Sequence, residues 1–176
     1  MKFNKKMVTV FMAVLMAVCL AVPAFAAPIN TDGDFADYIF GWEGQGAALL
    51  KGHGVNQTIT VGTQNSAPGD DVWRPVRMGN NYVIYNGMPG SYCVNIRRVL
   101  INGAYYYCTG YPYDDSTEGR DQLVKISNFG NYSIVRLADP LISGIWYMNA
   151  DFSNPVERSD VVWYIDHSKQ KARWTS

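Results

Sequence analysis

Aromatic and acidic side chains are concentrated between Thr109 and Arg120, where the chain reads TGYPYDDSTEGR. Tyr111 and Tyr113 flank a proline, and acidic residues follow at once. This combination suits sugar recognition, because the C–H face of a sugar stacks on an aromatic ring while its hydroxyls meet carboxylates. An ordinary acidic turn explains the same composition, and the spacing of the acids does not match a known calcium loop.

The sequence contains no recognisable catalytic motif. His53 and His167 are the two histidines, and no GxSxG or HExxH pattern occurs. Two carboxylates that cleave a glycoside must face each other across a cleft, which sequence alone does not define. The glycine-rich stretch 41–46 lacks the spacing of a phosphate-binding loop. We therefore expect a protein that is not an enzyme and uses no cofactor.

Residues 1–26 have the features of a cleaved signal peptide. A start with three lysines precedes an apolar run, Met7–Val22, and Ala24-Phe25-Ala26 fits a small-x-small cleavage site. A transmembrane anchor is the competing interpretation, but the run is short and no basic cluster follows it. The expectation is a secreted protein with a single domain over 27–176, of a size that can bury an adequate core.

Net charge and cysteine content limit the kinds of partner and site that the chain is expected to have. Taking the three leader lysines from 15 basic side chains leaves 12 against 15 acidic ones, a net charge near −3. Such a chain is a poor candidate for binding nucleic acid or an anionic membrane. Cys19 lies in the leader, so Cys93 and Cys108 remain as a natural disulfide pair in an oxidising compartment. No metal site is expected, because two cysteines and two distant histidines lack ligand spacing.

Two sequence anchors recur three times. The first is a tyrosine that opens a short strand, at Tyr38, Tyr82 and Tyr132. The second is an aspartate that precedes an apolar strand, at Asp71, Asp121 and Asp160. Asp71 and Asp121 each lie eleven residues before the next anchor tyrosine, and Gly and Asn precede that tyrosine, which is a hairpin signal. The pattern predicts repeats at approximately 38–79, 80–129 and 130–176.

These repeats predict an all-β fold. Short β-rich runs alternate with turn residues such as Asn102-Gly103, and no helical periodicity persists after the leader. Three units of about four strands favour a β-trefoil, because one unit cannot bury its own apolar face whereas three close a barrel. A β-sandwich is the alternative. Trp73, Leu123 and Trp163 are predicted to be core, and 171–174 to add a last strand pairing.

The second repeat carries a combination of motifs: Cys93-Val94-Asn95-Ile96, Asn102-Gly103, Tyr106-Tyr107-Cys108 and Asp121-Gln122-Leu123. It resembles one subdomain of a ricin B-chain-type β-trefoil lectin. The resemblance implies that Asn95, Tyr106, Asp121 and Gln122 bind sugar, and Cys93 and Cys108 fit the family's bridge within one repeat. Asn95 stands where the family has aspartate, and Asp121 stands where it has asparagine. An amide lacks the charge-assisted strength of a carboxylate.

Two further interpretations concern individual residues. Tyr106 belongs to a run of three tyrosines whose side chains alternate between strand faces, so a structural role competes with a stacking role. A weaker second site is expected at Asn149, Phe152 and Asp160 in the third repeat. Asn149 follows Trp146 by three residues, as Asn95 follows Tyr92.

The sequence thus predicts a lectin-like module whose partner is carbohydrate. The alternatives are a secreted β-trefoil protease inhibitor that presents the 109–120 loop with Arg120 as specificity residue, and a non-catalytic or toxin-associated interaction module. The sequence does not define the sugar, the number of active sites or the oligomeric state. Fold alone does not separate these functions, because trefoils host many of them.

Overall fold

The chain folds into short antiparallel strands and a 3-10 helix. The computed structural model describes residues 27–31, 38–39, 41–42, 49–62, 69–87, 92–150, 159–166 and 172–175. Its elements are β1 (Tyr38–Ile39), β2 (Gly41–Trp42), β3 (Leu49–Lys51), β4 (Thr60–Gly62), β5 (Val72–Met78), β6 (Asn81–Asn86), β7 (Cys93–Ile101), β8 (Tyr105–Tyr111), η1 (Thr117–Gln122), β9 (Val124–Phe129), β10 (Tyr132–Leu137), β11 (Tyr147–Ala150), β12 (Ser159–Tyr164) and β13 (Trp174–Thr175).

Turn residues close three hairpins where the sequence predicts them. Gly79 and Gly130 open the two-residue turns of β5–β6 and β9–β10 with φ of 63° and 62°. A residue other than glycine pays a steric cost at such angles, so glycine favours these hairpins. In β7–β8, Asn102 and Gly103 both have positive φ, 50° and 69°, and Ile101 pairs with Tyr105 across the turn.

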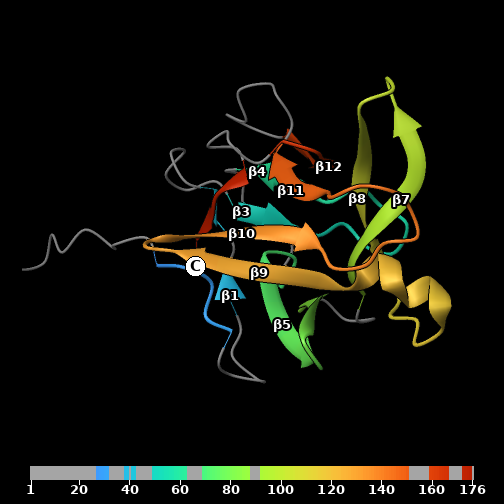
Figure 1. Cartoon of the computed structure of the whole chain (residues 1–176). Helices are drawn as coiled ribbons and strands as arrows, with labels where there is room; N and C mark the ends of the chain where they lie inside the picture. The colour runs from blue at the N-terminus through green and yellow to red at the C-terminus, as the bar shows by residue number, and fades with distance from the viewer. Residues whose placement is uncertain are drawn as a thin grey trace, which may run out of the picture.

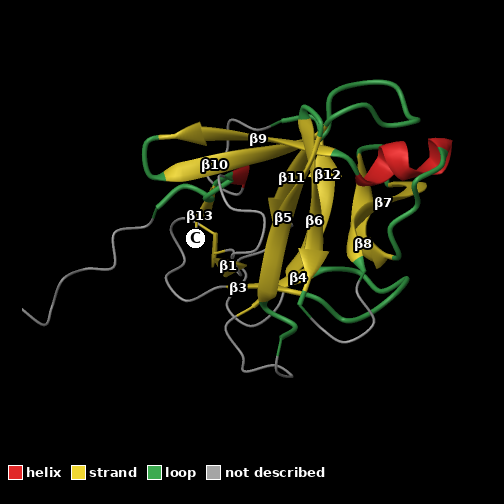
Figure 2. Ribbon diagram, turned by 90° about the horizontal axis from the view of Figure 1, so that it is seen from below, coloured by secondary structure: helices red, strands yellow, loops and turns green. Residues whose placement is uncertain are grey.

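Strand pairing closes the sheet on itself. Seven strands form a ring in the order β6, β7, β8, β12, β11, β10 and β9, since β9 pairs with both β10 and β6. Figures 1 and 2 show β9 and β10 running together across the molecule. Closure satisfies backbone groups that an open edge would expose, and it replaces the two separate sheets of a sandwich.

The pairing corrects the third repeat anchor. The strand at Asp160 was expected to be equivalent to those at Asp71 and Asp121, but β12 instead forms a hairpin with β11 and also pairs with β8 and β4. The short strand β13 occupies the position equivalent to that of β9, because Ser133 pairs with Trp174 as Tyr82 pairs with Val124. The pairing predicted for 171–174 is therefore confirmed for Trp174, which also pairs with Trp42.

Three tryptophans fill the core. Trp73, Trp163 and Trp174 are fully buried, and each indole N–H donates to a backbone carbonyl, at 2.9, 3.3 and 3.0 Å respectively. The core prediction is confirmed for Trp73 and Trp163. Leu123 lies between η1 and β9 and is half-buried, whereas its neighbour Val124, the first residue of β9, is fully buried.

The expected disulfide is corrected as well. Cys93 lies opposite Tyr111 and Cys108 opposite Ile96, and both thiols are free and buried. A three-residue offset separates the two cysteines by roughly 10 Å along the ladder and turns them to opposite faces. That separation exceeds the Cα–Cα distance of about 7 Å that a disulfide spans. The Cys93 thiol instead donates to the Tyr111 carbonyl at 3.3 Å.

Candidate functional site

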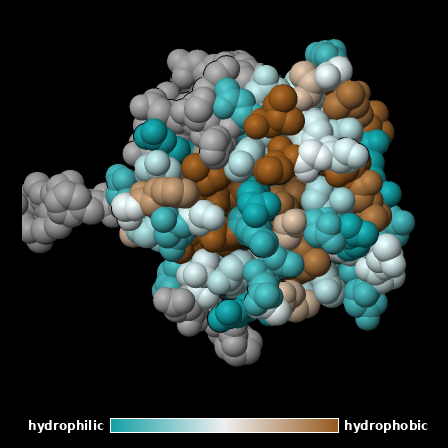
Figure 3. All heavy atoms as spheres, viewed as in Figure 1, coloured by the Kyte–Doolittle hydropathy of each residue, from teal (hydrophilic) through white to brown (hydrophobic). Residues whose placement is uncertain are grey.

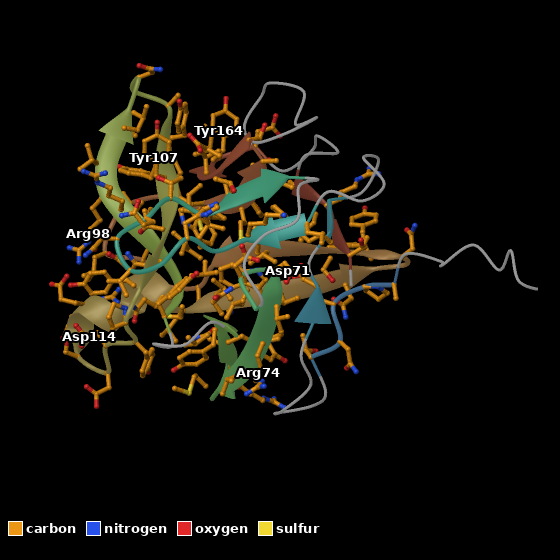
Figure 4. All side chains as sticks on the ribbon, turned by 180° about the vertical axis from the view of Figure 1, so that it is seen from behind. Asp71, Arg74, Arg98, Tyr107, Asp114 and Tyr164 are labelled. Atoms are coloured by element: carbon orange, nitrogen blue, oxygen red, sulfur yellow. The ribbon has the colours of Figure 1, made fainter. Side chains whose placement is uncertain are left out.

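One open pocket brings together three of the residues predicted for the main sugar site. It has a volume of about 230 Å³ and lies between β7, the end of β8 and η1. Its lining residues are Asn95, Ile96, Arg98, Tyr111, Asp114, Glu118, Asp121 and Gln122. Figure 4 shows Arg98 and Asp114 on this side of the molecule. We call this cavity the first pocket. It contains three of the four predicted sugar-binding residues.

The wall formed by η1 is built from local hydrogen bonds. Ser116 caps the helix, and its hydroxyl accepts from the Glu118 amide at 3.3 Å. The Asp114 carboxylate accepts from the Ser116 amide at 2.8 Å, and these bonds to Ser116 lower the pKa of Asp114. Gly119 is buried where a Cβ atom would collide with the Asp114 carbonyl, so the tight return of the chain requires glycine. The wall is therefore defined by its own sequence.

Gln122 holds this wall against the body of the protein. Its amide oxygen accepts from the Asp114 amide at 2.8 Å, and its amide nitrogen donates to the Pro112 carbonyl at 2.7 Å. Only 1% of the residue is exposed. Both ends of the amide are occupied by protein, so Gln122 positions the loop and its neighbours.

Asp121 is a buried carboxylate with two protein partners. One oxygen accepts from the Leu141 amide at 2.9 Å, and the other pairs with Arg98. Arg98 also pairs with Glu118 on the outer rim of the pocket. The side chain of Asp121 is 3% exposed, whereas those of Arg98 and Glu118 are 40% and 61% exposed. Asp121 thus orients Arg98 and links η1 to the chain around Leu141.

Among the predicted residues in this pocket, Asn95 has the side-chain amide with an acceptor still open to a ligand. Its nitrogen donates to the Ile96 carbonyl at 2.9 Å and makes a longer contact with the Thr109 hydroxyl at 3.5 Å. Among the described residues, nothing donates to its side-chain oxygen. The side chain is half-buried in the pocket wall, so this oxygen can accept a hydrogen bond from a ligand.

The aromatic residue of the pocket is Tyr111. Tyr106 does not line it; it packs on the core and meets Trp146 edge-on, with ring centroids 4.8 Å apart. Thr109, which pairs with Asn95, shares its face of β8 with Tyr111, whereas Tyr106 lies on the other face. Tyr111 is 43% exposed. The aromatic–acidic composition of 109–120 was the sequence signal for it.

A second pocket adjoins the first along the β7–β8 pair. Its volume is about 360 Å³, and it is lined by Asn56, Asn95, Arg97, Thr109 and Tyr111. Asn95 and Tyr111 border both pockets. The backbone N–H of Asn56 donates to the Gly110 carbonyl at 2.7 Å, so the segment after β3 forms one wall of the second pocket. The two cavities therefore adjoin at Asn95 and Tyr111.

The weaker second site is not assembled in the same way. Asn149 is 3% exposed, and its amide nitrogen donates to the carbonyls of Tyr147 and Asp166 at 3.0 and 3.3 Å. Asp160 is half-buried and pairs with Thr60 across β12–β4. Phe152 lies outside the described residues. Asn149 and Asp160 line neither the first nor the second pocket.

Comparison with solved structures gives the fold. A designed 3-fold symmetric protein, ThreeFoil, matches with a TM-score of 0.65 and 12% identity over 79% of this chain and 96% of that chain. A mosquitocidal holotoxin matches with a TM-score of 0.65 and 16% identity, over 80% of this chain and 17% of that chain. These proteins are β-trefoils. The chain has a fold of the β-trefoil type.

A Polyporus squamosus lectin bound to a human-type influenza-binding epitope shares this fold. It matches with a TM-score of 0.60 and 15% identity over 81% of this chain and 49% of that chain. At the level of sequence, no protein-family model and no curated protein matches the chain. The likeness at this identity concerns the fold alone.

The described residues contain neither a metal-binding cluster nor a membrane-spanning helix. No group of three or more histidine, cysteine or acidic side chains in them is arranged to hold a metal ion. No helix in the part of the chain that the structure describes has the length and apolar character needed to cross a membrane.

Proposed function

We propose that the protein is a secreted, non-catalytic carbohydrate-binding module of the ricin B-chain type. Residues 1–26 serve as its signal peptide, and 27–176 form one trefoil domain with repeats of approximately 38–79, 80–129 and 130–176. The equivalent pairings Tyr38–Trp73, Tyr82–Val124 and Ser133–Trp174 support three related units. Its partner is a glycan, which it binds without changing it.

The observation that carries this proposal is the arrangement of Asn95 beside Tyr111. The open side-chain oxygen of Asn95 accepts a bond from a sugar hydroxyl, while the exposed ring of Tyr111 presents a face for stacking. The rim carboxylates Asp114 and Glu118 accept further hydroxyls. Asp121 and Gln122 position these groups from within the protein. Asp121 pairs with Arg98, and Gln122 fixes the 112–114 loop by hydrogen bonds.

Binding at this site is expected to be weak for a single sugar. The cavity is open and about 230 Å³ in volume, below the range of about 300–1,000 Å³ common for ligand pockets. A shallow polar site gains little from burial, and the cost of fixing the ligand remains. Useful affinity then comes from clustered glycans or from several sites.

A glycan-array screen of the purified protein tests the proposal. Asn95→Ala and Tyr111→Ala are expected to lose glycan retention that the parent shows. Phe129→Ala removes an aromatic ring of similar exposure, 49%, that lies outside both pockets, and it should retain binding. Retention of no glycan by the parent would overturn the proposal. Equal loss in all three variants would point to a general structural effect instead.

The geometry gives less support to the protease-inhibitor alternative. The proposed reactive loop, 109–120, runs into the 3-10 helix 117–122. The Arg120 guanidinium donates to the carbonyl and carboxylate oxygens of Asp139 at 3.1 and 2.7 Å. An inhibitor of trypsin-like enzymes has to insert an extended basic residue into the enzyme's pocket. Arg120 is held against its own protein here.

A further inference from the structure

Arg97 and Arg98 are consecutive on β7 but serve different pockets. Successive residues of a strand point to opposite sides, so two neighbouring arginines reach different environments. Arg98 lines the first pocket and Arg97 lines the second. The ligand preference of the site follows from the charged groups that lie beside each guanidinium.

The charge of Arg98 is compensated within the protein. Its guanidinium pairs with Asp121 and Glu118, and Asp114 adds a further carboxylate to the same pocket. The first pocket therefore has an excess of negative charge. Acidic groups on a ligand are repelled there, whereas hydroxyl groups find carboxylate acceptors.

Arg97 has no such compensation. Within the described residues it forms no ion pair, hydrogen bond or cation–π contact. The other lining residues of the second pocket, Asn56, Asn95, Thr109 and Tyr111, are uncharged. A guanidinium is always protonated and presents a planar fork of donors that matches a carboxylate. The second pocket thus offers one positive charge among neutral hydrogen-bonding groups.

We propose that the two pockets form a single site for an acidic saccharide that carries one carboxylate, such as a uronic or sialic acid unit next to a neutral sugar. The carboxylate binds Arg97 in the second pocket, and the ring of the acidic sugar lies against Tyr111. The neutral neighbour places its hydroxyls among Asn95, Asp114 and Glu118 in the first pocket. This inference rests on the proposed carbohydrate-binding function and specifies its ligand class.

The opposite character of the two pockets also sets what is rejected. A glycan with charges on consecutive sugars would place an anion beside Glu118 and Asp114, where like charges repel it. Densely charged polyanions are therefore excluded. A neutral glycan binds but leaves Arg97 without a partner, and so it binds more weakly.

The test is an array that presents each carboxylated glycan beside its primary amide, its monosulfated analogue and its neutral parent. The amide keeps the shape and hydrogen-bonding groups but removes the charge. We expect the parent protein to prefer the carboxylate over the amide about tenfold, the gain from replacing a neutral hydrogen bond by a charge-assisted one. The preference should shrink as salt is added, since the site is open to solvent.

Arg97→Gln separates the charge from the rest of the site. The variant should bind the carboxylate and the amide equally, at the level at which the parent binds the amide. Arg77→Gln is the matched control, because Arg77 is an exposed arginine on β5 outside both pockets, and it should leave the preference intact. The two variants together assign the preference to one guanidinium.

The possible outcomes are distinct. Equal binding of carboxylate and amide by the parent overturns the inference while carbohydrate binding stands. A carboxylate preference that survives in Arg97→Gln, or binding of the sulfated analogue as tight as that of the carboxylate, also overturns it. Binding of no glycan at all removes the proposed function and this inference together.

Discussion

The hairpins β7–β8 and β11–β12 carry equivalent asparagines that differ in burial and in hydrogen bonding. Asn95 and Asn149 each follow a buried aromatic residue by three positions. Asn95 lies half-buried in a pocket with its side-chain oxygen open. Asn149 is 3% exposed, and its nitrogen bonds to the backbone at Tyr147 and Asp166. The same local motif thus lines an open pocket in one hairpin and ties the backbone together in the other.

The difference comes from the segment that follows each hairpin. After β8, the residues from Pro112 to Gln122 return as a loop and helix that stand beside β7 and make the second wall (Figure 2). After β12, the described chain at Asp166 is bonded to Asn149 itself. Figure 3 shows apolar patches lying among polar groups on the face that it draws. A site on this scaffold requires a connecting segment that leaves the hairpin residue open.

The largest expected effect concerns the anchor of that wall. Asp121→Ala should lower the free energy of unfolding by about 3 kcal/mol, because it leaves the Leu141 amide unpaired and Arg98 without its buried carboxylate. Asp139→Ala removes an exposed partner of Arg120 and should cost less than about 1 kcal/mol. Urea denaturation of both variants measures the contrast. Similar losses would mean that burial of Asp121 does not matter.

Substituting the two asparagines tests the comparison directly. Asn149→Ala should lower the free energy of unfolding by about 2 kcal/mol, since two carbonyls lose a buried donor, and should leave glycan binding intact. Asn95→Ala should cost less than about 1 kcal/mol and abolish glycan binding. The measurements are denaturation and array binding for each variant. A reversed pattern would show that the site lies in the third repeat.

Alkaline pH should act through the β7–β8 hairpin, which holds both buried thiols. Burial raises the pKa of Cys93 from 9.0 to about 12 and raises that of Cys108 as well. The two protonated thiols contribute fully to stability below pH 9, where they carry their protons in the folded and in the unfolded chain. This contribution is lost as pH rises toward 12, because the unfolded thiols ionise first. By pH 10 we expect a loss of about 1 kcal/mol per thiol.

Unfolding curves at pH 8 and pH 10 measure this effect. Cys93→Ala should show about half of the parent's decrease between these pH values. A decrease unchanged in that variant would assign the alkaline sensitivity to other groups.

The smallest effect is an expected absence of change. Because Cys93 and Cys108 are free and offset by three positions, adding a reductant should leave the melting temperature unchanged. The unfolded chain of residues 27–176, which lacks Cys19, should react with two equivalents of a thiol reagent without prior reduction. A mass two daltons lower, or a melting temperature that falls with reductant, would restore the bridge predicted from the sequence.

Several features followed from local sequence because their physical cause is local. Gly79, Gly130 and Asn102-Gly103 adopt backbone angles that few other residues tolerate, so their hairpins could be placed in advance. Trp73 and Trp163 are large apolar residues in alternating strands, and both are buried. The convergence of Asn95, Asp121 and Gln122 in one pocket followed from a family resemblance whose motifs survive in the second repeat.

Other predictions failed where long-range pairing decided the outcome. Asp160-Val161-Val162-Trp163 fits the pattern of a closing strand better than the short segment at Trp174, yet Trp174 pairs with Ser133. Tyr106 was favoured over Tyr111 by its distance from Cys108. Strand alternation relative to Thr109 places Tyr111 in the pocket instead.

The sequence by itself determined the β class, the tight turns and the buried tryptophans, because backbone preference and apolar periodicity act within a few residues. Only the tertiary structure decided which tyrosine borders the pockets, that the two cysteines stand apart, and that Arg97 faces a second pocket while Arg98 is compensated. These features depend on the register between strands and on the return of the 112–122 segment. A shift of one residue in register would exchange the faces of the strand and dismantle the site.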